Sequence, residues 1–281
     1  MPKVSVIIPC YNQGLFIEEA INSVLTQTFT DFEIIVINDG SNDQYTKELL
    51  SSYSPEKTKI FHTINKGVSA ARNLAIQNSN GKYILPLDAD DKIGSNYLME
   101  AVNVLDQNDQ IKLVYANGEY FGALTGCIKH PNYNEQTMLK QNLIFNSSFY
   151  RKIDWEICGG YDESFLTGWE DWEFWLRLIN HSNQVYKLDS SHLFYRIVSD
   201  SRNASLKNEQ LKIVEQQLYL KHISKYLEYI YLPLTHLREY EYLKNEQSNY
   251  VKYKNDIYNS FSYRLGRILL LPFKLMKRND K

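Results

Sequence analysis

The sequence of 281 residues contains few cysteines and no long uninterrupted run of apolar residues. Its three cysteines, Cys10, Cys127 and Cys158, are an odd number without paired spacing, so neither a disulfide framework nor a zinc site is indicated. No apolar stretch approaches the roughly 18 residues that a membrane-spanning helix needs. The five or so apolar residues near Met1 are too few for a signal peptide. We therefore expect the main body of the protein in the cytoplasm.

Glycine-rich phosphate-binding motifs are also missing. Neither a G-x-G-x-x-G motif nor a Walker-type loop follows any predicted strand, which argues against a dinucleotide site or a P-loop site. A nucleotide diphosphate bound by this chain would therefore need another source of positive charge, such as a metal ion.

The formal net charge of −2 is unevenly distributed. Residues 261–281 contain six Lys or Arg and one Asp, a net charge of +5, so the rest of the chain carries −7. The apolar centre of this tail is too short to span a bilayer and is flanked by basic residues, a composition typical of a segment lying at the surface of an anionic membrane. A C-terminal helix packed on the body is the alternative.

Strand and helix patterns alternate through the first half of the chain, which predicts an α/β fold with a doubly wound, mostly parallel sheet. The expected strands are 4–9, 32–37, 60–63, 83–87 and 112–115, and the expected helices are 15–27, 43–53, 69–78 and 96–105. Residues 117–150 have no clear period, and a packed helix begins just after Gly168. We assign residues 1–204 to this domain and 205–281 to a helical extension whose many tyrosines suit helix packing.

Polar residues follow four of the predicted strands, at the sheet edge where such folds bind ligands. These residues are 9–12, 38–40, 65–67 and 88–91. In the last group Asp88, Asp90 and Asp91 lie within four positions, where like charges raise the cost of ionisation. Such a cluster is stable either in solvent, as an ordinary acidic turn, or opposite a divalent cation with a preference for oxygen ligands.

A second acidic pair, Glu170 and Asp171, lies in the first turn of the helix after Gly168. Negative charge is favourable at a helix N-terminus, so this pair could be purely structural. On that reading Trp172 and Trp175, on the same helix, belong to the core.

Taken together, seven segments resemble the family 2 glycosyltransferases, which have the nucleotide-diphospho-sugar transferase (GT-A) fold and include enzymes of bacterial surface polysaccharide synthesis. The segments are 4–12, 18–28, 36–41, 65–73, 87–91, 159–163 and 170–178. Each motif is weak alone, but their order and spacing are specific. The resemblance covers roughly residues 3–200.

The resemblance implies a nucleotide site and a divalent cation. The nucleotide-binding residues would be Pro9, Tyr11, Asn12, Asp39, Lys66, Gly67, Arg72, Asp88 and Ala89, with Asp39 accepting a hydrogen bond from the base. Asp88 and Asp90 would form the D-x-D motif and bind Mn²⁺ or Mg²⁺, which neutralises charge on the leaving nucleotide.

The resemblance also implies a hexosyltransferase-type, inverting reaction. Asp171 would be the general base that takes the proton of the acceptor hydroxyl, with Glu170 as the alternative base or a neighbour that tunes Asp171. The donor would be a nucleotide-diphospho-sugar, with uridine as the first choice, and the acceptor a glycan or lipid-linked saccharide. Nucleic acid is not an expected partner, and homo-oligomerisation stays open. The alternative is a catalytically silent nucleotide-sugar or glycan-binding module on the same scaffold.

One feature departs from the family pattern. Many relatives carry a histidine two residues after the arginine of a Tyr-Arg pair, but here Tyr195-Arg196 is followed by Ile197 and Val198. His192 lies upstream and either replaces the missing histidine or has a structural role.

Overall fold

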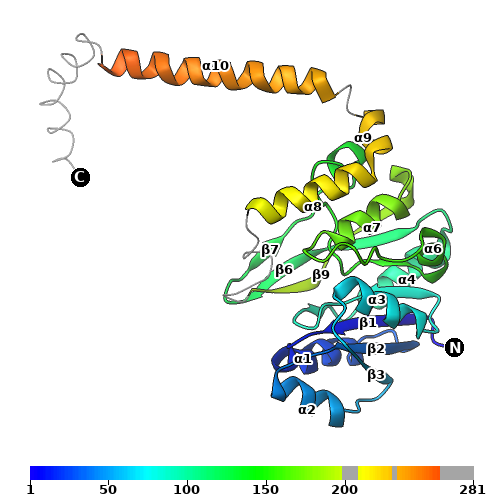
Figure 1. Ribbon diagram of the computed structural model, residues 1–281. Coiled ribbons are helices and arrows are strands. Elements are labelled where there is room, and N and C mark those ends of the chain that lie inside the picture. The colour runs from blue at the N-terminus through cyan, green and yellow to red at the C-terminus, as the bar shows by residue number, and fades with distance from the viewer. Residues whose placement is uncertain (198–207, 230–232, 260–281) are drawn as a thin grey trace, which may run out of the picture. The chain divides into compact units, whose positions relative to one another are not determined.

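The computed structural model describes residues 1–197, 208–229 and 233–259 (Figure 1). The chain forms two compact units, residues 1–222 and 223–281. The strands are β1 Val4–Cys10, β2 Phe32–Asp39, β3 Thr58–Thr63, β4 Tyr83–Pro86, β5 Lys92–Ile93, β6 Leu113–Gly122, β7 Gly126–Ile128, β8 Phe149–Arg151 and β9 Val185–Ile197. The helices are α1 Gly14–Leu25, α2 Gln44–Ser52, α3 Val68–Gln77, α4 Tyr97–Gln107, α5 Glu135–Met138, α6 Lys152–Cys158, α7 Glu170–Leu178, α8 Asn208–Lys221, α9 Ile223–Tyr229 and α10 Pro233–Asn259, with a 3₁₀ turn at Ser182–Gln184.

The first unit is built on one mixed sheet with the strand order β3-β2-β1-β4-β8-β6-β9-β5, and β7 pairs with β6. The pairs β1–β2, β1–β4, β2–β3 and β6–β9 are parallel, whereas β8 is antiparallel to both of its neighbours. The parallel half places the ends of β1, β2, β3 and β4 at one edge. The prediction of a mostly parallel, doubly wound sheet is therefore confirmed.

Every residue of β1 and β2 is buried because helices cover both faces of the sheet. Alternate residues of β1, Val4, Val6 and Ile8, share one core cluster with the apolar face of α1 and with α2 and α4. Helix α3 contacts β1 and β2, and its buried residues lie outside that cluster, on the opposite face. This packing holds the carboxyl ends of β1 and β2 in a fixed position.

The prediction of an irregular segment over 117–150 is wrong. Strand β6 continues to Gly122 along β9, and α5, β7 and β8 follow within the same range. Gly118 does not break the strand; it lets β6 approach β9, since a Cβ there would lie 2.8 Å from the carbonyl oxygen of Leu193. The pairing partner, β9, lies about seventy residues downstream and leaves no local signal.

Helix α8 belongs to the first unit, so the division lies after His222 and not at residue 204. The physical reason is a buried ionic cluster around Glu173 of α7, which is fully buried. Glu173 accepts hydrogen bonds from Arg177 (2.7 and 2.6 Å) and lies 2.9 Å from Lys221 Nζ and 3.2 Å from His222 Nε2. These partners lower the pKa of Glu173 to about 2 against the opposing effect of burial. The end of α8 is thereby tied to the helix that carries Glu170 and Asp171.

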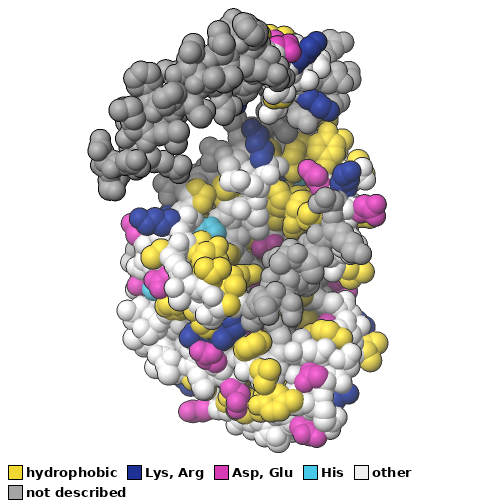
Figure 2. Space-filling view, turned by 90° about the vertical axis from the view of Figure 1, so that its left-hand side faces the viewer, with side chains coloured by type: hydrophobic (Ala, Val, Ile, Leu, Met, Phe, Trp, Pro, Cys, Tyr) yellow, Lys and Arg dark blue, Asp and Glu magenta, His cyan; other side chains and the backbone are white. Residues whose placement is uncertain are grey.

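The second unit contains α9 and α10. The predicted packing role fails for three tyrosines of α10, since Tyr242, Tyr250 and Tyr253 are exposed. The basic tail, 261–281, lies outside the described residues. Among the helices that are described, none is both long and apolar enough to cross a membrane. On the face of the molecule shown in Figure 2, the described acidic and basic side chains are intermixed.

Candidate active site

A cleft of about 560 Å³ opens at the sheet edge where β1, β2 and β4 end. It is lined by Pro9, Cys10, Tyr11, Asn12, Gln13, Phe16, Asp39, Asn65, Gly67, Val68, Arg72, Asp88, Asp90, Leu166, Tyr195 and Arg196. The structure thus brings together seven of the nine predicted nucleotide-binding residues, together with Asp90. The cleft has the size of a small-molecule site.

Asp39, at the end of β2, is buried and organises one wall of the cleft. Its two carboxylate oxygens accept hydrogen bonds from the backbone N–H groups of Lys66 and Gly67, each at 2.9 Å. Gly40 follows with φ +64°, and a Cβ at that position would lie 2.3 Å from the backbone nitrogen of Asn65. The loop after β2 therefore fits closely against the loop after β3, and one lone pair of each Asp39 oxygen is already used by backbone donors.

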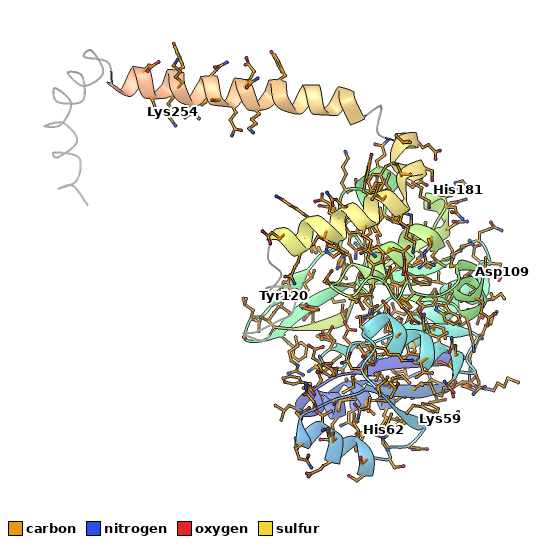
Figure 3. The ribbon with its side chains drawn as sticks, in the orientation of Figure 1. Lys59, His62, Asp109, Tyr120, His181 and Lys254 are labelled. Atoms are coloured by element: carbon orange, nitrogen blue, oxygen red, sulfur yellow. The ribbon has the colours of Figure 1, made fainter. Side chains whose placement is uncertain are left out.

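Asn12 holds the neighbouring loop in the same way. It has a left-handed backbone (φ 56°), and its Oδ1 accepts hydrogen bonds from Asn42 N (2.8 Å) and Asp43 N (3.2 Å). Further along this edge, Asn38 Nδ2 lies 3.2 Å from Nδ1 of His62, whose position on β3 is shown in Figure 3. Asn12 and Asp39 both line the cleft and connect its loops.

Two predicted nucleotide contacts lie elsewhere. The Ala89 side chain is fully buried in the core cluster and does not line the cleft. Lys66 is exposed and borders a smaller adjacent hollow of about 160 Å³. Neither side chain lines the cleft, and at Lys66 it is the backbone N–H that contacts a cleft residue, Asp39.

Arg72 connects the two acidic groups. It lies on α3 and is 2% exposed, its Nη2 donates to Asp88 Oδ1 at 2.8 Å, and its Nη1 donates to Glu170 Oε1 at 2.8 Å. Asp88 and Glu170 together raise the pKa of the Arg72 guanidinium, although burial alone would lower it. One buried cation thus joins the D-x-D segment to the first turn of α7.

Asp88 and Asp90 both face the cleft, and their donor chemistry fits a divalent cation. Burial and the neighbouring charge of Asp88 raise the pKa of Asp90, so a cation there would stabilise its ionised form. Within residues 1–197, 208–229 and 233–259, no three His, Cys, Asp or Glu side chains converge on a metal position. Two carboxylates completed by substrate phosphates and water are a usual Mg²⁺ arrangement.

Asp91 has a different role from its neighbours. Its Oδ1 accepts a hydrogen bond from the backbone N–H of Arg196 at 2.8 Å, and it is 3% exposed. Arg196 Nε donates to the carbonyl oxygen of Asp90 at 2.7 Å, and the guanidinium lies 4.7 Å from the Phe16 ring and 4.3 Å from the Phe121 ring. These contacts fix the acidic loop against β9 and place a cation on the cleft wall.

His192 does not join the site. It is buried, its ring stacks on Tyr97 with centroids 5.0 Å apart, and its Nε2 lies 3.0 Å from Glu100 Oε2. It is absent from the cleft lining. The structural role is therefore the one that the geometry supports.

Asp171 is half-buried at the start of α7, after Trp169 in a left-handed conformation (φ 65°). Burial and the adjacent charge of Glu170 raise the pKa of Asp171 to about 7, although Arg72 acts in the opposite direction. A carboxyl group with this pKa can accept a proton near neutral pH. Glu170 is 4% exposed and is held by Arg72, which makes Asp171 the more accessible of the two.

Several residues of the site were not identified from the sequence. Gln13, Phe16 and Leu166 line the cleft, and Asn146 Nδ2 donates to Asp88 Oδ1 at 3.2 Å. Tyr195 and Arg196 also line it, and the Tyr-Arg pair was the one available signal for them. The others lie on loops or helix faces where a single polar or apolar residue has no pattern.

The model of the family described as Glycosyl transferase family 2 matches residues 5–167, more than half of the chain. The chain therefore belongs to this family, as its motifs predicted. The match contains the first acidic cluster and the loops of the cleft, whereas Glu170 and Asp171 follow it.

Individual relatives extend the similarity. An uncharacterized glycosyltransferase of Rickettsia bellii is 42% identical over 109 residues, 39% of this chain and 16% of that protein. Chondroitin synthase of Escherichia coli is 26% identical over 255 residues, 85% of this chain and 35% of that protein. A crystal structure of S. aureus TarS in complex with UDP-GlcNAc superposes with a TM-score of 0.62 at 18% identity, over 81% of this chain and 73% of that one. The chain spans less than a fifth of the length of the R. bellii relative, and the TarS likeness confirms the fold.

Proposed function

We propose that the protein is an inverting, metal-dependent glycosyltransferase. It moves a sugar from a nucleotide-diphospho-sugar to a hydroxyl of a glycan or lipid-linked saccharide in cell-surface polysaccharide synthesis. The observation that carries the proposal is the Arg72 bridge: one buried guanidinium holds both Asp88, a D-x-D carboxylate in the cleft, and Glu170, the neighbour of Asp171. UDP-sugars are the first donors to test, because the TarS structure contains UDP-GlcNAc.

Each group of the network has a chemical task in this reaction. Asp171, with a pKa of about 7, takes the proton from the acceptor hydroxyl. The hydroxyl oxygen attacks the anomeric carbon at the same time, and the bond from that carbon to the diphosphate breaks. Glu170 keeps that pKa high, and Arg72 fixes both Glu170 and Asp88. Asp88 and Asp90 would hold a divalent cation, which supplies positive charge to the leaving diphosphate. A single displacement with one base inverts the anomeric configuration.

A donor screen with metal removal tests this proposal. Nucleotide sugars that bind the native state should raise the melting temperature in the presence of Mn²⁺. With the stabilising donor, EDTA should reduce release of the nucleotide by at least about 10²-fold, and excess Mn²⁺ should restore it. Asp90→Asn should need a higher Mn²⁺ concentration for half-maximal rate.

Two outcomes would contradict the proposal. Undiminished turnover in EDTA would refute the metal requirement. Stabilisation by a donor without turnover on any glycan or lipid-linked acceptor would favour a silent nucleotide-sugar-binding module. Glu156→Gln, an exposed change on α6, serves as the control that should leave the metal response unchanged.

We also propose that residues 261–281 attach the protein to the inner face of an anionic membrane. The supporting observation is their net charge of +5 on a chain that otherwise carries −7. Deleting these residues should abolish cosedimentation with vesicles containing anionic lipid, because basic residues near such a surface contribute about 1 kcal/mol each. Neutral vesicles are the control, and undiminished binding of the truncated protein to anionic vesicles would refute the attachment.

A further inference from the structure

Asn142 lies in the segment between α5 and β8 and is exposed, but the backbone that carries it is firmly held. The neighbouring side chains of Leu139, Leu143 and Ile144 are buried. The carbonyl oxygen of Leu143 lies 2.9 Å from Nδ1 of His130. An exposed polar side chain is thus presented from an anchored base.

The orientation of the Asn142 amide is determined on both sides. Its Oδ1 accepts a hydrogen bond from the backbone N–H of Ile144 at 3.2 Å, so the amide nitrogen faces the other way. That nitrogen donates to Oδ2 of Asp171 at 3.0 Å. The other carboxylate oxygen of Asp171, Oδ1, accepts from the backbone N–H of Trp172 at 2.7 Å. Each oxygen of Asp171 therefore receives one hydrogen bond.

A second contact fixes the same segment against α7. Trp172 Nε1 donates to the carbonyl oxygen of Met138 at 2.7 Å, and both residues are buried. The first turn of α7 therefore meets the 138–142 segment through a buried bond at Trp172 and an exposed bond at Asp171. The buried bond anchors the Trp172 side chain to the backbone of the 138–142 segment. The exposed bond is then left to orient the Asp171 carboxylate.

We propose that Asn142 is a positioning residue for Asp171, holding its carboxylate in the single orientation that receives the acceptor hydroxyl. This inference rests on the proposed role of Asp171 as the base. The amide hydrogen bond favours the ionised carboxylate. Among the described residues, the charged groups that act on Asp171 are Glu170 on α7, Arg72 on α3 and Asp88 after β4, and Asp171 in turn acts electrostatically on Tyr161 in the turn after α6.

NMR titration of aspartate carboxyl carbons tests the proposal without a substrate. Full-length protein labelled with ¹³C-aspartate is titrated from pH 4 to 9, and Asp171→Asn assigns the Asp171 signal. Asn142→Leu, of similar size without a donor, should raise the Asp171 midpoint by about one pH unit, because a hydrogen bond to a charged group is lost. Asn142→Asp should raise it further, since it adds a like charge. Asn134→Ala, which removes an exposed side-chain cap from α5 in the same region, is the matched control and should leave the midpoint unchanged.

The outcomes separate this inference from the proposed function. An unchanged Asp171 midpoint in both Asn142 variants, at unchanged melting temperature, would overturn the positioning role and leave the base assignment intact. A shifted midpoint together with full turnover in Asp171→Asn would instead reject Asp171 as the base. With a donor identified, Asn142→Leu should lower kcat at least about fivefold at pH 7 and leave it below the unsubstituted value at pH 9, where the carboxylate is ionised but no longer oriented, with the donor KM unchanged. Full recovery of kcat at pH 9 would reduce the role of Asn142 to an effect on the Asp171 pKa and overturn the positioning role.

Discussion

Asp171→Asn is expected to reduce sugar transfer about 10³-fold, because an amide of the same size cannot take the proton of the acceptor hydroxyl. Nucleotide affinity should stay within about twofold of the unsubstituted protein, since Asp171 lies outside the cleft lining. Calorimetry with UDP and steady-state rates with the donor found by screening measure the two quantities. For the unsubstituted protein, kcat/KM should rise with pH through about 7, as the base loses its proton.

Stability provides an internal check on the same variant. The folded-state pKa of Asp171 is about 7, above its ordinary value of 3.8, so the free energy of unfolding falls as pH rises between these values. An amide at position 171 does not titrate, so this loss of stability with rising pH is absent, and Asp171→Asn should melt no lower than the unsubstituted protein at pH 8.

Glu170→Gln tests why the pKa of Asp171 is raised. It should move the acidic limb of the pH–rate profile to lower pH, because burial still raises the Asp171 pKa but the neighbouring charge of Glu170, which adds to that effect, is gone. Retained turnover in Asp171→Asn would show that Asp171 is not the general base.

The parallel half of the fold is predictable because each element carries its own local pattern. Val4–Pro9 and Phe32–Ile37 are apolar, β-branched runs, and Ile17, Ile21 and Val24 recur at helical spacing on the buried face of α1. Since parallel strands end at one edge, the meeting of Asp39 and Asp88 in one cleft follows from the same pattern. Strands β8 and β9 were missed because their pairing is non-local and β9 is only partly buried.

The connections between site residues were far less predictable than their positions. Arg72 and Glu170 lie 98 residues apart, and their ion pair has no local sequence signal. Asn142 and Asn146 donate hydrogen bonds to Asp171 and Asp88, but each is a single polar residue in a segment without regular period. Such contacts depend on how β6, β8 and α7 pack together, which no window of the sequence records.

Arg72→Met is expected to have the largest effect on stability. It removes the cation from a network in which the Glu170 side chain is 5% exposed, so this buried carboxylate loses its ion pair with Arg72. Breaking a buried pair in this way costs about 3–5 kcal/mol in the free energy of unfolding. Urea unfolding at pH 7 measures the loss. Lys59→Met is the control. The Lys59 side chain is 53% exposed, and the buried Glu33 carboxylate keeps its hydrogen bonds from Ser5 and from the backbone of Asn80, so we expect a loss of about 1 kcal/mol or less.

The double variant Arg72→Met/Glu170→Gln separates the two tasks of Arg72. Neutralising Glu170 removes the buried charge whose ion pair with Arg72 was lost, so a substantial part of the lost stability should return. Turnover should not return, because Asp88 also loses its 2.8 Å partner beside the cleft. If the double variant stayed as unstable as Arg72→Met, the cost would lie in lost packing around the guanidinium. If it regained turnover, Arg72 would have no task in the reaction beyond compensating Glu170, and the bridge between the D-x-D segment and α7 would be structural.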